Sequence, residues 1–225
     1  MTFSIVARCA DSGHFGVAVT SSSPAVAARC AFVRAGTGAV ASQNVTDPRL
    51  GPLVLDAMAA GLDAPAAVTR VTGTAENTGW RQLLAVDARG ETAIFSGDHT
   101  LGINAEGRAQ DAASAGNLLA NSDVPAAVLA GFAAASGHLG DRLMAALFAG
   151  LDAGGEAGPL HSAGMLIAGA QSWPLVDLRC DWTEACPIRA VDAAWQVYRP
   201  QMDDYVMRAL DPAASPSYGV AGDDR

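Results

Sequence analysis

Lysine is absent from this chain of 225 residues: its 14 basic residues are all arginines, and 23 acidic residues give a net charge of −9. Schiff-base enzymes, pyridoxal-phosphate enzymes and P-loop nucleotidases all need a lysine amine, so these three classes are excluded. Basic clusters are also missing, which argues against nucleic acids and anionic membranes as partners, because both attract clustered cations. The expected partner is a small molecule.

Long apolar runs are missing too. Polar residues, Gly or Pro interrupt each apolar stretch before the roughly 20 residues of a membrane span. The first eight residues lack the charged start and apolar core of a secretory signal, so we expect a cytoplasmic protein. In that compartment Cys9, Cys30, Cys180 and Cys186 are expected to be free thiols. The four histidines show no paired metal-ligand spacing, and we expect neither a metal nor an organic cofactor.

Strand-like and helix-like segments follow one another in groups. Alternating apolar residues between turn residues predict strands, and apolar residues at helical spacing predict helices. The predicted strands cover residues 3–8, 15–20, 31–34, 38–43, 80–87, 91–95, 115–119, 163–168 and 175–180. The predicted helices cover about 48–62, 63–71, 123–132, 139–151 and 188–210, the last interrupted near Pro200.

Paired strands followed by paired helices indicate an α+β domain with antiparallel sheets, since parallel sheets alternate strand and helix strictly. No segment resembles a linker, so we expect one domain over residues 1–210 and a Pro/Gly/Asp-rich tail over 211–225. Exposed sheet edges and an alanine-rich helical surface favour a homo-oligomer. The alanines are Ala126, Ala127, Ala130, Ala133 and Ala134.

Thr2 follows the initiator methionine and opens the first predicted strand. Aminopeptidases remove methionine before a small residue, which would give Thr2 a free α-amine. Such an amine titrates at about 7.7–8.0, so part of it is unprotonated at neutral pH and can accept the proton of the Thr2 hydroxyl. A small second residue is common, however, and position alone does not decide between a catalytic and an ordinary threonine.

A resemblance to a known family rests on three N-terminal segments, residues 2–7, 16–30 and 38–51, and on the shorter segments 81–83, 116–119 and 161–164. Through them the chain resembles, over nearly its whole length, the N-terminal-nucleophile (Ntn) hydrolase-like family catalogued as domain of unknown function 1028. The resemblance implies a four-layer αββα sandwich, with two antiparallel sheets between helix layers. It also implies that Thr2 lies at the end of a central strand.

The resemblance further implies catalytic roles. Thr2 would be nucleophile and base, and Ser22 belongs to a serine run that follows the second strand, where the fold places groups that tune the nucleophile. A backbone N–H of residues 42–44, with the carboxamide of Asn44 or Asn117, would stabilise the oxyanion. Both asparagines are equally suited to turn capping or a buried hydrogen bond. Proteasome-like members of this fold class use an aspartate and a lysine beside the threonine; this chain has Thr20 and no lysine, which weakens a transfer of peptide hydrolysis.

Five residues are candidates for substrate binding. Arg49 and Arg81 have the fork geometry that recognises a carboxylate, although a structural salt bridge is the ordinary role of such arginines. Asp47 precedes Arg49 in the same segment, and Ser21 opens the serine run. His161 lies at a strand entrance, where it would touch substrate or cap a loop.

These observations predict an Ntn-type amidohydrolase that cleaves a linear amide or carbamoyl bond of a small carboxylate-bearing metabolite. The alternative is a catalytically inactive protein that binds a metabolite or a partner protein; a metal-dependent hydrolase would need a stoichiometric metal. A Ser22–His161–Asp98 triad stays open, without a nucleophile elbow to support it. The glycine-rich segment 36–41 is rejected as a dinucleotide site, since a strand follows it rather than a helix.

Overall fold

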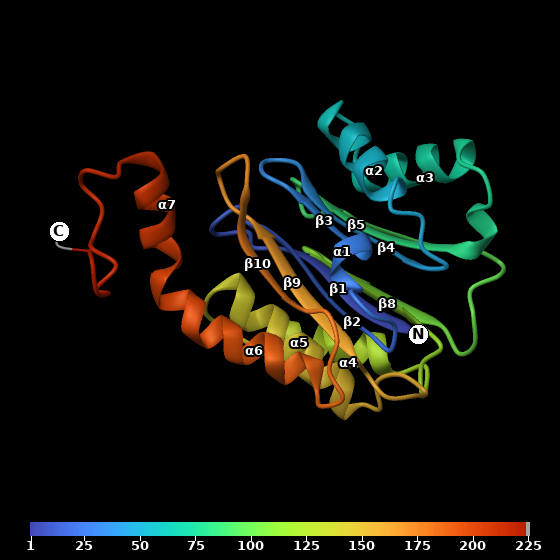
Figure 1. Ribbon diagram of the computed structural model, residues 1–225. Coiled ribbons are helices and arrows are strands. Elements are labelled where there is room, and N and C mark those ends of the chain that lie inside the picture. Colours follow the sequence, from blue (N-terminus) through green and yellow to red (C-terminus); the bar gives the residue numbers. More distant parts are fainter. Residues whose placement is uncertain (224–225) are drawn as a thin grey trace.

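Ten strands in the described part of the chain, residues 1–223, form two antiparallel sheets in this computed structural model (Figure 1). One sheet contains β1 (Thr2–Arg8), β2 (Phe15–Ser21), β7 (Ala105–Ala109), β8 (Ala112–Asn117), β9 (Ser162–Ala168) and β10 (Pro174–Cys180). The other contains β3 (Ala31–Arg34), β4 (Gly38–Asn44), β5 (Arg81–Asp87) and β6 (Thr92–Ser96). The strand orders are β10-β9-β2-β1-β8-β7 and β3-β4-β5-β6, so β1 is a central strand.

The main helices follow the strands in pairs. They are α2 (Leu50–Ala59), α3 (Ala64–Thr74), α4 (Val124–Ala134), α5 (Leu139–Asp152), α6 (Pro187–Tyr198) and α7 (Met202–Leu210). A short α1 (Ala27–Cys30) and the 3-10 turns η1 (Thr78–Trp80) and η2 (Arg199–Gln201) complete the set. None of the helices in residues 1–223 has the length and apolar character of a membrane span.

Local sequence explains where two of the helices begin. The Asp63 carboxylate accepts a hydrogen bond from the Ala66 N–H at the start of α3. At the start of α5 the His138 ring accepts from the Gly140 N–H, while the carboxylate of Asp141 accepts from the His138 N–H. These bonds satisfy N–H groups that have no partner within the first helical turn.

Three apolar cores hold the sheets and helices together. Phe3 and Ile5 of β1 pack with α4, α5 and α6 on one face of the six-stranded sheet. Val6, on the opposite face of β1, packs with Ala41 of the four-stranded sheet, so the two sheets face each other. The outer face of the four-stranded sheet packs against α2 and α3. Figure 1 shows α2 and α3 on one side of the sheets, α4 to α6 on the other, and α7 extending away from the sheets.

Each predicted strand has a counterpart in the structure, and the last predicted helix is interrupted at Arg199–Gln201, close to the predicted position. One predicted strand needs correction, and one strand was not predicted. The strand predicted over 115–119 runs from Ala112 to Asn117, because Leu118 has a positive φ of 52° and leaves the sheet. The edge strand β7 was not predicted, since its sequence Ala-Glu-Gly-Arg-Ala lacks apolar alternation.

The last described segment and the four cysteines complete the description of the chain. From residue 211 to residue 223 the described chain contains turns and bends but no helix or strand. Residues 224–225, the end of the predicted tail, lie outside the described part. The four cysteines are unpaired thiols, as predicted.

Candidate functional site

Thr2 occupies the first position of β1, between β2 and β8. It lies opposite Asn117 on β8, and the pairing of Phe3 with Thr20 places Ser21 of β2 on its other side. Side chains alternate along a strand, so Thr2 faces the second sheet whereas Phe3 faces the helices. Only 5% of Thr2 is exposed. The structure therefore brings three of the predicted site residues together at one end of the space between the sheets.

The Thr2 hydroxyl lies in a small cluster of oxygen atoms. Its Oγ1 donates to the Met1 carbonyl oxygen at 2.5 Å and lies 3.3 Å from the Oγ of Ser21. The Ser21 hydroxyl donates to the same carbonyl oxygen and accepts from the N–H of Ser23. The Met1 carbonyl thus occupies the acceptor position of both hydroxyls. Removal of Met1 would leave the contact with Ser21 Oγ as the remaining one of these two bonds to Thr2 Oγ1.

Buried carboxamides lie beside Thr2 and connect the two sheets. Ser4 Oγ donates to Gln43 Oε1 at 2.7 Å, and Gln43 Nε2 donates to Gln82 Oε1 at 2.7 Å. Asn117 Nδ2 donates to the same Gln82 oxygen at 3.2 Å. All four side chains are at most 1% exposed. Because every link is directional, these bonds fix the surroundings of Thr2 across both sheets.

A buried carboxyl group, that of Glu156, lies next to the cluster around the Thr2 hydroxyl. Among the described residues near Thr2, it is the carboxyl group whose pKa is shifted. It lies in the loop between α5 and β9 and forms an isolated bridge with Leu119. Burial raises the pKa of Glu156 from 4.5 to about 7, while the positive N-terminal amine and a hydrogen bond from the Ser22 N–H oppose the shift. Glu156 was not among the predicted site residues.

The side chains of the predicted catalytic residues Ser22 and Asn44 bind different parts of the structure. Ser22 lies one residue beyond Ser21, and its N–H and hydroxyl bind the carboxylate of Glu156. The Asn44 side chain instead ties the end of β4 to neighbouring loops: its Nδ2 donates to the Trp80 carbonyl, and its Oδ1 accepts from the Leu101 N–H. Asn44 has a positive φ of 70°, a conformation that asparagine tolerates at a turn.

Asp47, Arg49 and Arg81 form a charged group after the end of β4. The Arg49 guanidinium holds the Asp47 carboxylate through two bonds of 2.9 and 2.7 Å, and this pairing is the main reason why the pKa of Asp47 is lowered. The side chain of Arg49 is 83% exposed, whereas that of Asp47 is 8% exposed. Arg81 donates to the Val45 carbonyl and adds positive charge beside Asp47. The structural role anticipated for both arginines is therefore present.

The side chain of His161 is engaged by the loop that follows β10. Its ring stacks on Trp182 with centroids 4.2 Å apart, and Nδ1 lies 2.9 Å from the Thr183 carbonyl oxygen. The His161 N–H donates to the carbonyl of Ser21, which extends the pairing of β2 with β9. The backbone of His161 therefore supports the site, while its ring holds a loop.

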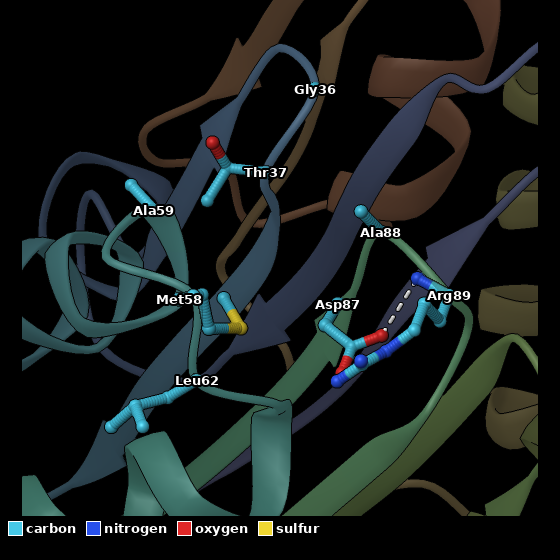
Figure 2. A pocket seen from close by; sticks show the side chains of 9 residues that line it. Gly36, Thr37, Met58, Ala59, Leu62, Asp87, Ala88 and Arg89 are labelled. Atoms are coloured by element: carbon cyan, nitrogen blue, oxygen red, sulfur yellow. Dashed lines mark hydrogen bonds between the residues drawn. The ribbon is translucent and has the colours of Figure 1, made fainter.

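A separate hollow of about 330 Å³ lies between the turn before β4, the end of α2 and the turn after β5 (Figure 2). β4 begins here at Gly38 and carries Gln43 at its other end, so the hollow is remote from Thr2. Asp87 accepts bonds from the N–H groups of Ala64 and Arg89, the second of which Figure 2 shows. This carboxylate serves the backbone and offers no evident chemistry.

A family of unknown function, DUF1028, has a sequence model that matches residues 2–191. The chain belongs to this family. A DUF1028 protein of known crystal structure, SPO2555 from Silicibacter pomeroyi, is 31% identical, covers 88% of each chain and superposes with a TM-score of 0.81. Anbu (ancestral beta-subunit) from Yersinia bercovieri is 9% identical, with an alignment that covers 90% of this chain and 97% of that protein, and superposes with a TM-score of 0.39. No curated protein matches the chain.

All site residues of this DUF1028 chain lie within the matched segment. The side chains of four of them, Ser4, Gln43, Gln82 and Glu156, were not predicted as parts of the site. Gln43 and Gln82 carried a usable signal: each is a polar residue in phase with apolar positions that face the other sheet, such as Ala41 and Leu84. A polar group at a core position needs a partner. Glu156 carried no comparable signal, because its burial depends on a loop returning to the sheet. Within residues 1–223, no three His, Cys, Asp or Glu side chains gather as a metal site would need.

Proposed function

We propose that this chain is an Ntn hydrolase with four-layer αββα architecture, which cleaves a linear amide or carbamoyl bond of a small carboxylate-bearing metabolite. The observation that carries the proposal is the place of the Thr2 hydroxyl: it is buried at the end of a central strand, faces the second sheet, and lies between Ser21 and Asn117. A threonine in this position needs only a free α-amine to become a nucleophile with its own base.

The proposed reaction begins once Thr2 is the N-terminal residue. Its α-amine accepts the hydroxyl proton while Oγ1 attacks the carbonyl carbon of the substrate. The same amine then donates the proton to the leaving nitrogen, and water hydrolyses the threonyl ester. Asn117 Nδ2 has two hydrogens and uses one on Gln82, so the other is free to bind the oxyanion. The proposal includes a cytoplasmic location, because methionine aminopeptidase, which would remove Met1, acts there.

The restricted space around Thr2 supports a small substrate. The buried carboxamides of Gln43 and Gln82 fill the region between the sheets next to Thr2. We therefore propose that the substrate approaches Thr2 from the end of the strand. Arg49 is the candidate for recognition of a carboxylate, because its guanidinium is largely exposed while Asp47 orients it.

The test uses the chain expressed without an N-terminal tag, treated with a small β-lactone that acylates a nucleophilic hydroxyl. Intact mass gives the state of Met1 and the number of adducts. We expect loss of Met1 and a single adduct that is retained in Thr2→Ser and lost in Thr2→Ala. Both variants keep a small second residue, so methionine removal is matched between them.

Retention of Met1, or an exposed Thr2 that does not react, would refute the proposal. Either result would favour the alternative, a catalytically inactive protein of the same fold that binds a metabolite or a partner. Thr2 would then be an ordinary strand residue whose hydroxyl is satisfied by the Met1 carbonyl.

A further inference from the structure

The loop between α5 and β9 brings a carboxyl group to the end of β1, between the neighbouring strands β2 and β8. Gly154 and Gly155 have positive φ angles of 121° and 61°, which turn the chain back toward the sheet directly before Glu156. The backbone of Glu156 bridges to Leu119, two residues beyond the end of β8, and Glu156 Oε2 accepts from the Ser22 N–H, one residue beyond the end of β2, at 3.1 Å. Glu156 therefore spans the two strands that flank β1.

The strand registers show which residue of the first strand lies at this level. Continuing the antiparallel pairing of Phe3 with Thr20 places Met1 beside Ser22. Glu156 bonds to Ser22, so its carboxylate lies level with Met1, one residue from the nitrogen of Thr2.

A second contact places the same loop against the N-terminus. The Met1 side chain lies over Gly158, where a Cβ atom would come within 2.8 Å of Met1 Cε. The loop that carries Glu156 therefore forms the wall against which Met1 rests, and removal of Met1 would uncover it.

One oxygen of this carboxyl group has no partner. Glu156 Oε1 is fully buried and forms no hydrogen bond in the described part of the chain, although Oε2 is satisfied. A buried carboxylate oxygen without a donor is costly, which points to a group that the unprocessed chain does not supply. Among the charged groups in residues 1–223, the N-terminal amine is the one whose charge lowers the pKa of Glu156. The charge of this amine also opposes the raised pKa of Cys30, at the end of α1. Asp152, four residues earlier on α5, is exposed.

We propose that the free oxygen of Glu156 accepts a hydrogen bond from the α-amino group of Thr2 once Met1 is gone, and so holds the amine against the Thr2 hydroxyl. Glu156 is then a positioning residue, since it acts on the substrate only through the amine. Its role in a reaction rests on the proposed function, but the contact itself does not.

The contact has a consequence for the proton. In the chain with Met1, burial raises the pKa of Glu156 to about 7. In the proposed contact the carboxylate favours the protonated amine and the protonated amine favours the carboxylate, so the two groups hold one proton between them near neutral pH. When the proton lies on the carboxyl oxygen, the amine is free to accept the hydroxyl proton of Thr2. The carboxyl group and the amine thereby provide a proton acceptor for the Thr2 hydroxyl without a lysine, which the sequence lacks.

The test measures the titration of the amine in the full chain released from a cleavable fusion with Thr2 as its first residue. Because the chain has no lysine, the α-amine is its only amine. The rate of N-acetylation by acetic anhydride, followed by intact mass after hydroxylamine has removed acetyl groups from hydroxyls and thiols, therefore reports on this amine alone. We expect the midpoint of the pH–rate profile to fall by about one to three pH units in Glu156→Gln. Glu106→Gln, which changes an exposed carboxyl on β7, is the matched control and should not move it. An equal midpoint in Glu156→Gln and the parent would overturn the inference.

Treatment of the same samples with the β-lactone separates the two proposals. A reactive parent whose midpoint is unaffected by Glu156→Gln refutes the contact and leaves the hydrolase intact. An unreactive parent whose midpoint does move refutes the hydrolase and leaves the contact intact. Circular dichroism checks folding, and Glu156→Asp covers the case in which Glu156→Gln does not fold: it keeps the charge but shortens the reach, and should give a smaller downward shift of the midpoint. No shift in Glu156→Asp would then count against the contact.

Discussion

Replacement of Glu156 by Gln in the chain that retains Met1 should make stability less dependent on pH. Glu156 is 6% exposed, and its pKa is about 7 in the folded chain against 4.5 ordinarily. Because the folded-state pKa is the higher one, the folded protein holds the proton more tightly. The stabilisation from this proton is fully present below about pH 4.5 and is lost as the pH rises through 7. A difference of about 2.5 pH units corresponds to about 3 kcal/mol, of which about 2.5 kcal/mol is expressed between pH 5 and pH 8.

Urea unfolding at pH 5 and pH 8 measures this contribution as the pH-dependent part of the difference between Glu156→Gln and the parent. Gln keeps an oxygen that accepts from the Ser22 N–H, and any cost of its buried NH₂ group is the same at both pH values. With a slope of about 2.5 kcal/mol per M of urea, the gap between the two midpoints should change by about 1 M in favour of the variant at pH 8.

Two controls make the result decisive. Glu106→Gln removes an exposed carboxyl and should leave the pH dependence unchanged. The chain with Thr2 as its first residue should show a smaller effect, because its amine would stabilise the charged carboxylate. A change below about 0.5 kcal/mol between the two pH values, in the chain with Met1, would show that the Glu156 carboxyl is not desolvated, and the reasoning would be wrong.

Three further predictions concern other parts of the structure. Gln43→Leu leaves the buried Gln82 oxygen with one donor fewer and should lower the free energy of unfolding by about 2–4 kcal/mol, measured by urea unfolding; a loss below about 1 kcal/mol would contradict the network. Asp47→Asn should remove a source of acid instability: the pKa of Asp47 is lowered in the folded chain, so its stabilising effect is present at neutral pH and is lost as the pH falls, and thermal unfolding below pH 5 should be less pH-dependent in the variant. Gly140→Ala puts a Cβ within 2.6 Å of the buried Trp195 ring and should destabilise by about 1–3 kcal/mol in calorimetry, whereas an unchanged melting temperature would refute the close packing.

The sequence was sufficient to predict most strands and helices, because their signals are local. β1 and β2 show apolar alternation on either side of a turn at Gly13, and α5 shows helical spacing up to Gly154. β7 escaped prediction because it lies at the sheet edge, where its residues are mostly exposed and carry no apolar pattern.

The candidate site was predictable only in part. Thr2, Ser21 and Asn117 end strands that the sequence identifies, so their meeting follows from the pairing of β1 with its two neighbours. For Asn44 the sequence left two roles open, stabilisation of the oxyanion or turn capping. Its side chain bonds to the Trp80 carbonyl and the Leu101 N–H, contacts that depend on the path of η1 and of the residues after β6. The position of Glu156 depends on a loop that contacts the ends of two strands, and no hydrophobic periodicity in the sequence predicts such a contact.

The hydrogen bonds of Ser4 with Gln43 and of Asn117 with Gln82 join the two sheets and have a mechanical consequence. Elsewhere the two sheets meet mainly through Val, Ala and Leu side chains, whose contacts have no preferred direction, while these hydrogen bonds hold one end of the sheets in a defined register. A larger side chain in place of Val86, toward the opposite end of β5, should therefore increase the distance between the sheets at that end and leave it unchanged at the hydrogen-bonded end. Thr2 lies at the end that these hydrogen bonds hold, so the packing at the other end can change without displacing the Thr2 hydroxyl.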